Sequence, residues 1–229
     1  MELIQTSDIH NHLLPGVDDG FRDPADSLAA MSKMAEFGCT DFVFTPHMNP
    51  DVFPDMTEAR HREVYDEFCS HLPRIPAVTT HLAAEYMVVK GFEQRVSSRA
   101  DELHIFPDRS ILIEMSYYYR SQNLEQTLFE LNMAGLKPIL AHPERYLYMA
   151  DSLGDFDKIV GMGCRLQLNL MSLTGQYGRE SMKILDHLLS HGMYSFMATD
   201  LHSLAQLDRI LDFKPGFFLK RKLRKCFEL

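Results

Sequence analysis

The sequence predicts an α/β fold with about seven parallel strands, and we favour a barrel over an open sheet. A repeated unit supports this prediction: an amphipathic helical stretch, a glycine and a short β-rich run recur at least four times, with the glycines at Gly38, Gly135, Gly163 and Gly192. Alternating helices and strands are typical of parallel sheets, open or closed. The length of 229 residues and the 45% hydrophobic content suit one barrel-sized domain.

Local signals place the individual elements. Asp23 and Pro24 form an N-cap and first-turn pair before apolar residues at helical spacing, and Gly38 ends that helix. We expect strands at residues 3–9, 40–45, 80–84, 111–115, 138–141, 165–170 and 194–199. Residues 46–57, with three prolines, are the most loop-like segment. Because no linker rich in Pro, Gly or Ser divides the chain, we expect one domain over residues 1–229.

Charge and composition exclude several classes of protein. The net charge of −9 argues against a nucleic-acid surface. No apolar stretch reaches 18 residues and no basic leader opens the chain, so we expect a soluble, cytoplasmic protein with no transmembrane segment and reduced cysteines. Basic residues gather near residues 214–229, where a solvated tail is expected and a contact with an acidic partner or a membrane surface is the alternative: Lys214, Lys220, Arg221, Lys222, Arg224 and Lys225.

Residues that bind metals follow the predicted strands. The first strand leads into Asp8-Ile9-His10-Asn11-His12, and alternation along a strand puts both histidines on one side. Active sites of α/β barrels are assembled at the carboxyl ends of the strands, and imidazole and carboxylate ligands suit Zn, Mn or Fe. Nine candidates lie at such ends: His10, His12, Asp19, His47, Glu85, Glu114, His142, Asp200 and His202. The six other histidines have no expected role in a site: His61, His71, His81, His104, His187 and His191.

The chain resembles the PHP (polymerase and histidinol phosphatase) superfamily, and most closely its bacterial capsule-type, manganese-dependent protein-tyrosine phosphatases. The resemblance covers essentially the whole chain, and its most specific motifs are Gly16-Val17-Asp18-Asp19-Gly20 and Ala141-His142-Pro143-Glu144-Arg145-Tyr146. It implies a distorted TIM-like barrel with three divalent metal ions, most often Mn, with Fe or Zn as alternatives. It also implies three ligand sets: His10, His12, Glu85 and Asp200; Glu85, Glu114 and His142; and Asp19, His47 and His202. The choice of Asp19 over Asp18 rests on the motif register.

The resemblance implies hydrolysis of phosphotyrosine by a metal-bridging hydroxide, with the tail of a bacterial tyrosine kinase that governs polysaccharide export as substrate. Arg145 is the candidate phosphate clamp because a guanidinium grips two oxygens, and an outward ion pair with Glu144 is its alternative. Arg120, after the aromatic run Tyr117–Tyr119, is a second candidate, at the rim of the pocket.

Other phosphatase chemistries have less support. A cysteine-dependent phosphatase needs an arginine six positions after its cysteine, where Cys39, Cys69 and Cys164 are followed by Thr45, Ile75 and Leu170. No GxSxG elbow supports a serine hydrolase. Two alternatives stay open: a small-molecule phosphatase, such as one acting on histidinol phosphate, and a non-catalytic regulator that binds a phosphorylated tail. The sequence leaves the oligomeric state open.

Overall fold

The computed structural model describes residues 3–70, 72 and 78–227, and all its strand pairs are parallel. One sheet has the order β1-β2-β4, with bounds Ser7–Asp8, Asp41–Phe44 and Thr79–Leu82. A second sheet has the order β3-β5-β6-β7-β8-β9, with bounds His47–Met48, Glu85–Met87, Ser110–Glu114, Lys137–Ala141, Arg165–Asn169 and Tyr194–Ala198. The predicted α/β class with parallel sheets is confirmed.

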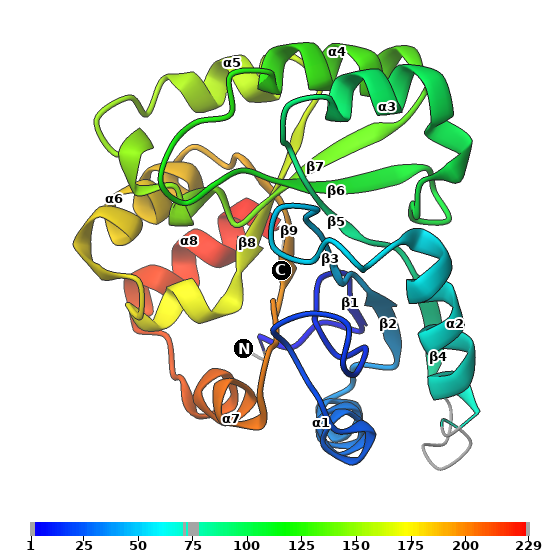
Figure 1. The fold of residues 1–229 in the computed structure, drawn as a ribbon. Coiled ribbons are helices and arrows are strands. Elements are labelled where there is room, and N and C mark those ends of the chain that lie inside the picture. The colour runs from blue at the N-terminus through cyan, green and yellow to red at the C-terminus, as the bar shows by residue number, and fades with distance from the viewer. Residues whose placement is uncertain (1–2, 71, 73–77, 228–229) are drawn as a thin grey trace.

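Helices surround the strands (Figure 1). Helices α3, α4 and α5 lie in a row beside β6 and β7, α6 packs against α8, and α1 contacts α7. Their bounds are α1 Pro24–Glu36, α2 Glu58–Cys69, α3 Phe92–Arg99, α4 Leu124–Met133, α5 Asp155–Gly161, α6 Gly178–Ser190, α7 Leu204–Asp212 and α8 Phe217–Phe227. Short 3₁₀ turns cover Ala100–Glu102, Pro143–Arg145, Leu147–Met149 and Leu170–Thr174. None of the described helices is long and apolar enough to cross a membrane.

The predicted helix stops are the observed ones. Gly38, Gly135, Gly163 and Gly192 each lie two residues after a helix with φ between +64° and +93°, a conformation that favours glycine. A strand begins two or three residues after each of these glycines. At the start of α1, Asp23 caps the helix by accepting a hydrogen bond from the Ala25 amide at 2.8 Å. Local chemistry therefore fixes these four junctions.

The strand pattern differs from the predicted single barrel of seven strands. The described residues form nine short strands in two sheets, because the second and third predicted strands, observed as β2 and β4, are each followed by a separate short strand beyond the predicted end, β3 and β5. The break between β2 and β3 falls at Pro46, which has no amide hydrogen to donate. Pairing continues across the gaps, since Ala83 donates to Phe44 O at 2.9 Å and Glu85 donates to Pro46 O at 3.0 Å. The first strand is also shorter than predicted.

The segments after β1 and β9 lie side by side. Asn11 and Leu201 form a parallel bridge, and the Asp200 amide donates to His10 O at 2.8 Å. The buried Asp8 carboxylate accepts hydrogen bonds from the backbone amide of Thr199 at 3.0 Å and from its hydroxyl at 2.7 Å. Both ends of the sequence therefore bring candidate ligands to one edge of the sheets.

Two remaining expectations concern the cysteines and the basic end of the chain. All four cysteines are unpaired, and Cys39 and Cys164 are buried as expected. The basic segment, where a solvated tail is expected, contains a helix, since residues 217–227 form α8. Leu219, Leu223 and Cys226 have the spacing of one helical face and pack against the core, with Leu223 fully buried.

Candidate metal centre

All nine predicted ligands converge. They form four overlapping groups in which the ligand atoms lie within 4.8 Å of one another: His12, Asp19, His47 and His202; His10, His12 and Glu85; His10, His142 and Asp200; and His47, Glu85 and Glu114. Seven of the nine residues are buried or nearly so, while His202 is partly exposed and Asp19 is the most exposed. Of the histidines with no expected role, His71 lies outside the described residues.

The backbone holds two of these side chains in strained conformations. His142 follows β7 with φ +32°, and Asp200 follows β9 with φ +49°. Positive φ is uncommon for residues other than glycine and is found where the surrounding structure imposes it, often at functional sites. The strand ends therefore aim both side chains into the centre.

Glu85 lies between the histidines at the base of the centre. Its Oε1 is 3.3 Å from His10 Nε2 and 2.9 Å from His142 Nε2. Its Oε2 is 2.9 Å from His47 Nδ1. The carboxylate thus faces several clusters at once, as a bridging ligand would.

Glu114 and His142 do not share a group. His47 Nδ1 is 2.9 Å from Glu114 Oε1, whereas His142 Nε2 is 4.0 Å from Glu114 Oε2. His142 instead groups with His10 and Asp200. The nine side chains come together as expected, but their grouping differs in part from the three ligand sets that the family resemblance implies.

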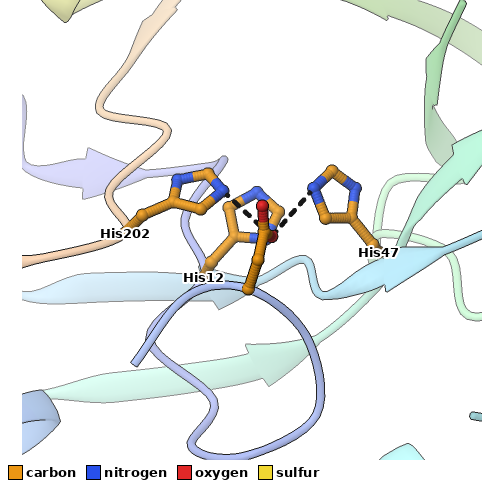
Figure 2. Close-up of side chains that lie close together, drawn as sticks. His12, His47 and His202 are labelled. Atoms are coloured by element: carbon orange, nitrogen blue, oxygen red, sulfur yellow. Dashed lines mark ion pairs between the residues drawn. The ribbon is translucent and has the colours of Figure 1, made fainter. Parts of the chain in front are cut away.

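The outer group contains Asp19. Figure 2 shows His12, His47 and His202 gathered around one carboxylate, with dashed lines for two ion pairs. Asp19 Oδ1 is 3.5 Å from His47 Nε2 and 3.5 Å from His202 Nε2. The rings of His12 and His202 stack with centroids 4.0 Å apart. This group lies at the open side of the centre, because Asp19 is 63% exposed.

Asp18 has a different environment from its neighbour. Its Oδ2 accepts a hydrogen bond from His12 Nδ1 at 2.7 Å and from the His47 amide at 3.1 Å, and its Oδ1 accepts from the Gly20 amide at 2.9 Å. A side chain at Gly20 would collide with His12, because a Cβ atom there would lie 2.4 Å from the His12 Cβ. Asp18 therefore orients His12 with Nε2 toward the centre, which favours Asp19 as the ligand.

Sequence reasoning missed two buried amides of β8. Gln167 Oε1 is 2.8 Å from His10 Nδ1, and Asn169 Nδ2 donates to Asp200 Oδ2 at 2.6 Å. These contacts leave His10 Nε2 and Asp200 Oδ1 facing each other at 3.4 Å. The available signal was the alternation of Arg165, Gln167 and Asn169 with leucines in the predicted strand, which puts both amides on one face.

Arg145 lies at the centre and Arg120 does not. Arg145 Nη1 donates to Asp200 Oδ2 at 2.7 Å, and its guanidinium is between the rings of Tyr117 and Tyr177, at 4.3 and 4.6 Å from their centroids. Its neighbour Glu144 is buried and accepts hydrogen bonds from Asn169, Ser172 and Tyr194, so the alternative pairing of Arg145 with Glu144 is wrong.

Arg120 is occupied by other carboxylates. It donates to Asp155 at 3.1 Å and to Glu125 at 2.5 Å, neither of which is a candidate ligand, whereas Arg145 pairs with Asp200. Its role in the site is therefore less well supported than that of Arg145.

The sequence matches the family described as capsular polysaccharide synthesis, CpsB/CapC, over residues 6–212. The chain belongs to this family. Tyrosine-protein phosphatase YwqE of Bacillus subtilis (strain 168) is 27% identical over 197 residues, which cover 86% of this chain and 77% of the relative. Putative tyrosine-protein phosphatase CapC of Staphylococcus aureus is 26% identical over 226 residues, covering 96% and 85%. The expected capsule-type resemblance is confirmed.

Solved structures agree with this CpsB/CapC assignment. A chain from the crystal structures of YwqE from Bacillus subtilis and CpsB from Streptococcus pneumoniae, described as unique metal-dependent tyrosine phosphatases, has a TM-score of 0.76 and 25% identity, covering 96% of this chain and 94% of that one. The phosphotriesterase homology protein from Escherichia coli has a TM-score of 0.58 at 13% identity, covering 99% and 94%, and is similar in fold alone.

Charges in the centre of this CpsB/CapC member favour protonated histidines beside ionised carboxylates. Burial lowers the pKa of His12, but the Asp18 and Asp200 carboxylates together more than offset burial and raise this pKa to about 10. Burial opposes charge on His47 in the same way, and Glu114 and Glu85 hold its pKa well above the usual value. For Asp200, burial is outweighed by His10 and other cations, and its pKa lies well below the usual range. The protons on these histidines lie where a bound metal ion would otherwise balance the charge of the carboxylates.

The donor atoms fit divalent metal ions. Within the described residues, Oε2 of Glu114 and Nδ1 of His142 are buried and have no hydrogen-bond partner, and Glu85 Oε2 and Glu114 Oε1 share one neighbour, His47 Nδ1, which lies 2.9 Å from each. A buried carboxylate without a partner is costly, and a bound cation removes that cost. Nitrogen and oxygen donors of this kind suit Mn, Fe and Zn.

A cavity of about 600 Å³ opens over the centre. Asp19, His47 and Glu114 lie in its wall, together with Phe53 and Tyr117. The Phe53 ring is nearly parallel to that of His47, with centroids 6.0 Å apart. Aromatic walls beside the charged centre suit a ligand with one aromatic and one anionic end.

Proposed function

We propose that the chain is a metal-dependent protein-tyrosine phosphatase. The convergence of nine ligand-type side chains, three of which line one partly aromatic cavity, carries this proposal. Its similarity to tyrosine phosphatases of the CpsB/CapC family supports the same reaction. The proposed substrate is the phosphotyrosine-bearing tail of a bacterial tyrosine kinase that regulates capsular or exopolysaccharide synthesis, and the proposed location is the cytoplasm.

The proposed cofactors are three divalent ions, with Mn as first choice and Fe or Zn as alternatives. Their ligands would be the nine side chains that cluster in the centre, with Glu85 shared between ions. Bound divalent ions lower the pKa of water and neutralise charge on a phosphoryl group. In fold, we propose that the two parallel sheets together represent a distorted TIM-like barrel of seven interrupted strands.

The chain's own side chains position the substrate in this proposal. Arg145, held between Tyr117 and Tyr177, is close enough to Asp200 to offer its remaining donors to phosphate oxygens. Phe53 and Tyr117 would contact the tyrosyl ring in the cavity. Burial of the centre strengthens each of these charge interactions.

The test compares two substrates on protein loaded with Mn. We expect a higher kcat/KM for a phosphotyrosyl peptide than for histidinol phosphate, and the reverse preference would make the chain a small-molecule phosphatase. His142→Ala should abolish turnover, whereas Cys→Ser variants at 39, 69, 164 and 226 should retain it. Binding of the peptide without any hydrolysis by the Mn-loaded protein would instead identify a non-catalytic regulator.

A further inference from the structure

Helix α8 exposes a stripe of cations and aromatic rings that the phosphatase proposal does not use. The helix begins with Phe217 and Phe218, which are 75% and 76% exposed, and contains five basic residues and no acidic one. The family match ends at residue 212, before this helix. In Figure 1, α8 (red) lies beside α6.

The two faces of α8 have separate roles. Leu219, Leu223 and Cys226 pack inward, and Lys222 pairs with Asp186 of α6. Four outward residues follow the spacing i, i+4, i+7 and i+8 from Phe217, and Phe218 borders them with Arg221 and Lys225 at i+3 and i+7, so all five share one broad stripe along the helix. This outer stripe consists of Phe217, Phe218, Arg221, Arg224 and Lys225, all exposed.

Intrinsic helix stability does not explain this composition. Cations in the last turn favour a helix through the macrodipole, but Lys220 and Arg221 lie in the first half, where the dipole disfavours positive charge. Among the described residues, Lys222 is the one cation of α8 with an ion-pair partner. Two adjacent exposed phenylalanines are likewise unfavourable in water.

The charge of the outer stripe contrasts with that of the whole chain. The protein has 23 Lys and Arg against 32 Asp and Glu, yet residues 214–229 hold six of the cations and one carboxylate. At physiological ionic strength, charges are screened beyond about 8 Å, so an anionic surface meeting α8 is attracted by the local cations. The acidic remainder of the chain would repel the same surface in other orientations.

We propose that the outer stripe of α8 docks the protein on an anionic lipid bilayer. Arg221, Arg224 and Lys225 would contact lipid phosphates, while Phe217 and Phe218 would insert at the boundary of the acyl chains. Stable peripheral attachment generally needs two signals, and the stripe supplies an electrostatic one and an apolar one. A convex helix presents a ridge with no pocket, which suits a flat, fluid surface better than a folded partner.

The stripe lies away from the metal centre. The end of α8 contacts the start of β9, where Cys226 Sγ donates to Tyr194 O at 3.7 Å, while Asp200 and His202 follow the other end of that strand. Substitutions in the stripe therefore leave the candidate ligands untouched.

The test is co-sedimentation of the full chain with vesicles of phosphatidylcholine, alone or mixed with phosphatidylglycerol. We expect the protein to bind only the vesicles that contain phosphatidylglycerol, and we expect this binding to weaken as the salt concentration rises. The triple variant Arg221→Gln/Arg224→Gln/Lys225→Gln should bind about 100-fold more weakly, at about fivefold per cation. Phe217→Ser/Phe218→Ser should reduce binding at least about tenfold. Unchanged melting temperatures would show that both variants are folded.

Matched control variants distinguish a specific effect of the stripe from a general effect of net charge or of exposed apolar area. Arg60→Gln/Arg99→Gln/Lys158→Gln removes the same charge from exposed sites, and Phe129→Ser/Met133→Ser removes exposed apolar area from α4. Both controls should bind like the unmodified protein, and equal losses would overturn the proposal. Failure to bind anionic vesicles would also overturn it, and if the same cations then bound polyglutamate, the stripe would serve an acidic protein.

Discussion

At the scale of single residues, the centre depends on side chains that hold the ligands as much as on the ligands. A histidine can present only one nitrogen to a metal when its other nitrogen is fixed by a hydrogen bond. Gln167 provides that contact for His10, and Asp18 provides it for His12. Both ligands are therefore orientated before any ion binds.

Replacing Gln167 by Met should weaken metal binding. The substitution keeps the length of the side chain but removes the acceptor that fixes the His10 ring, and loss of such a contact typically costs 10- to 100-fold in metal affinity, here about tenfold or more. Titration of the metal-free protein with Mn against a competing chelator measures this change. The control is Gln126→Met on the exposed face of α4, and equal affinities for the two variants would contradict the assigned role.

The convergence of the candidate ligands could be predicted from the sequence, whereas the residues that support them could not. His10, Glu114 and Asp200 are residue types that bind metals, and each follows or ends a recognisable strand. Gln167 and Asn169 are common residues whose importance depends on the neighbouring strand ends that they reach. The positions of the candidate ligands in the sequence also do not show which of them lie in the same cluster. That depends on distances in the folded chain, such as the 4.0 Å between His142 Nε2 and Glu114 Oε2.

At the scale of elements, the helix-to-strand junctions were predictable because a glycine with positive φ is a local signal. The two additional short strands, β3 and β5, were not, since they depend on which neighbours each segment pairs with. The helix at residues 217–227 was not predicted, because the basic residues dominate the composition of this segment. Its packing depends instead on Leu219, Leu223 and Cys226, which contact the core.

Helix α2 buries a histidine that the metal centre does not use. His61 is fully buried, and neither ring nitrogen has a hydrogen-bond partner among the described residues. Burial, reinforced by repulsion from His104, lowers the pKa of His61 from 6.5 to about 4. The folded state therefore keeps this ring neutral at a pH where the unfolded chain protonates it.

This difference predicts acid sensitivity. A lowered pKa gives stability that is complete above about pH 6.5 and is lost as pH falls toward 4, amounting to about 2–3 kcal/mol at pH 4.5. His61→Leu should remove this loss, so urea unfolding of the metal-free protein should be less dependent on pH in the variant. His81→Leu, at a side chain 46% exposed, is the control. Equal pH dependence of the unmodified protein and His61→Leu would contradict the prediction.

At the scale of the whole molecule, folding brings several buried carboxylates close together, and their negative charge must be neutralised within the centre. Four carboxylates and five histidines from both halves of the chain meet at one edge of the sheets. Without metal, neutralisation comes from protons: burial opposes charge on His10, His12 and His47, but the carboxylates around each ring together outweigh burial and raise these pKa values. Metal ions and protons therefore compete for the same nitrogens.

This competition fixes the sign of the pH dependence of metal binding. Because the metal-free protein holds protons on these histidines at neutral pH, binding must release them, and each released proton makes log Ka rise by about one per pH unit. We expect Mn affinity to increase from pH 6 to pH 8.5 with a slope above one. Calorimetric titrations in buffers of different ionisation enthalpy count the protons released. An affinity independent of pH, with no proton release, would contradict this competition, because it requires either that the histidines are already neutral in the metal-free protein or that the carboxylates alone bind the ion.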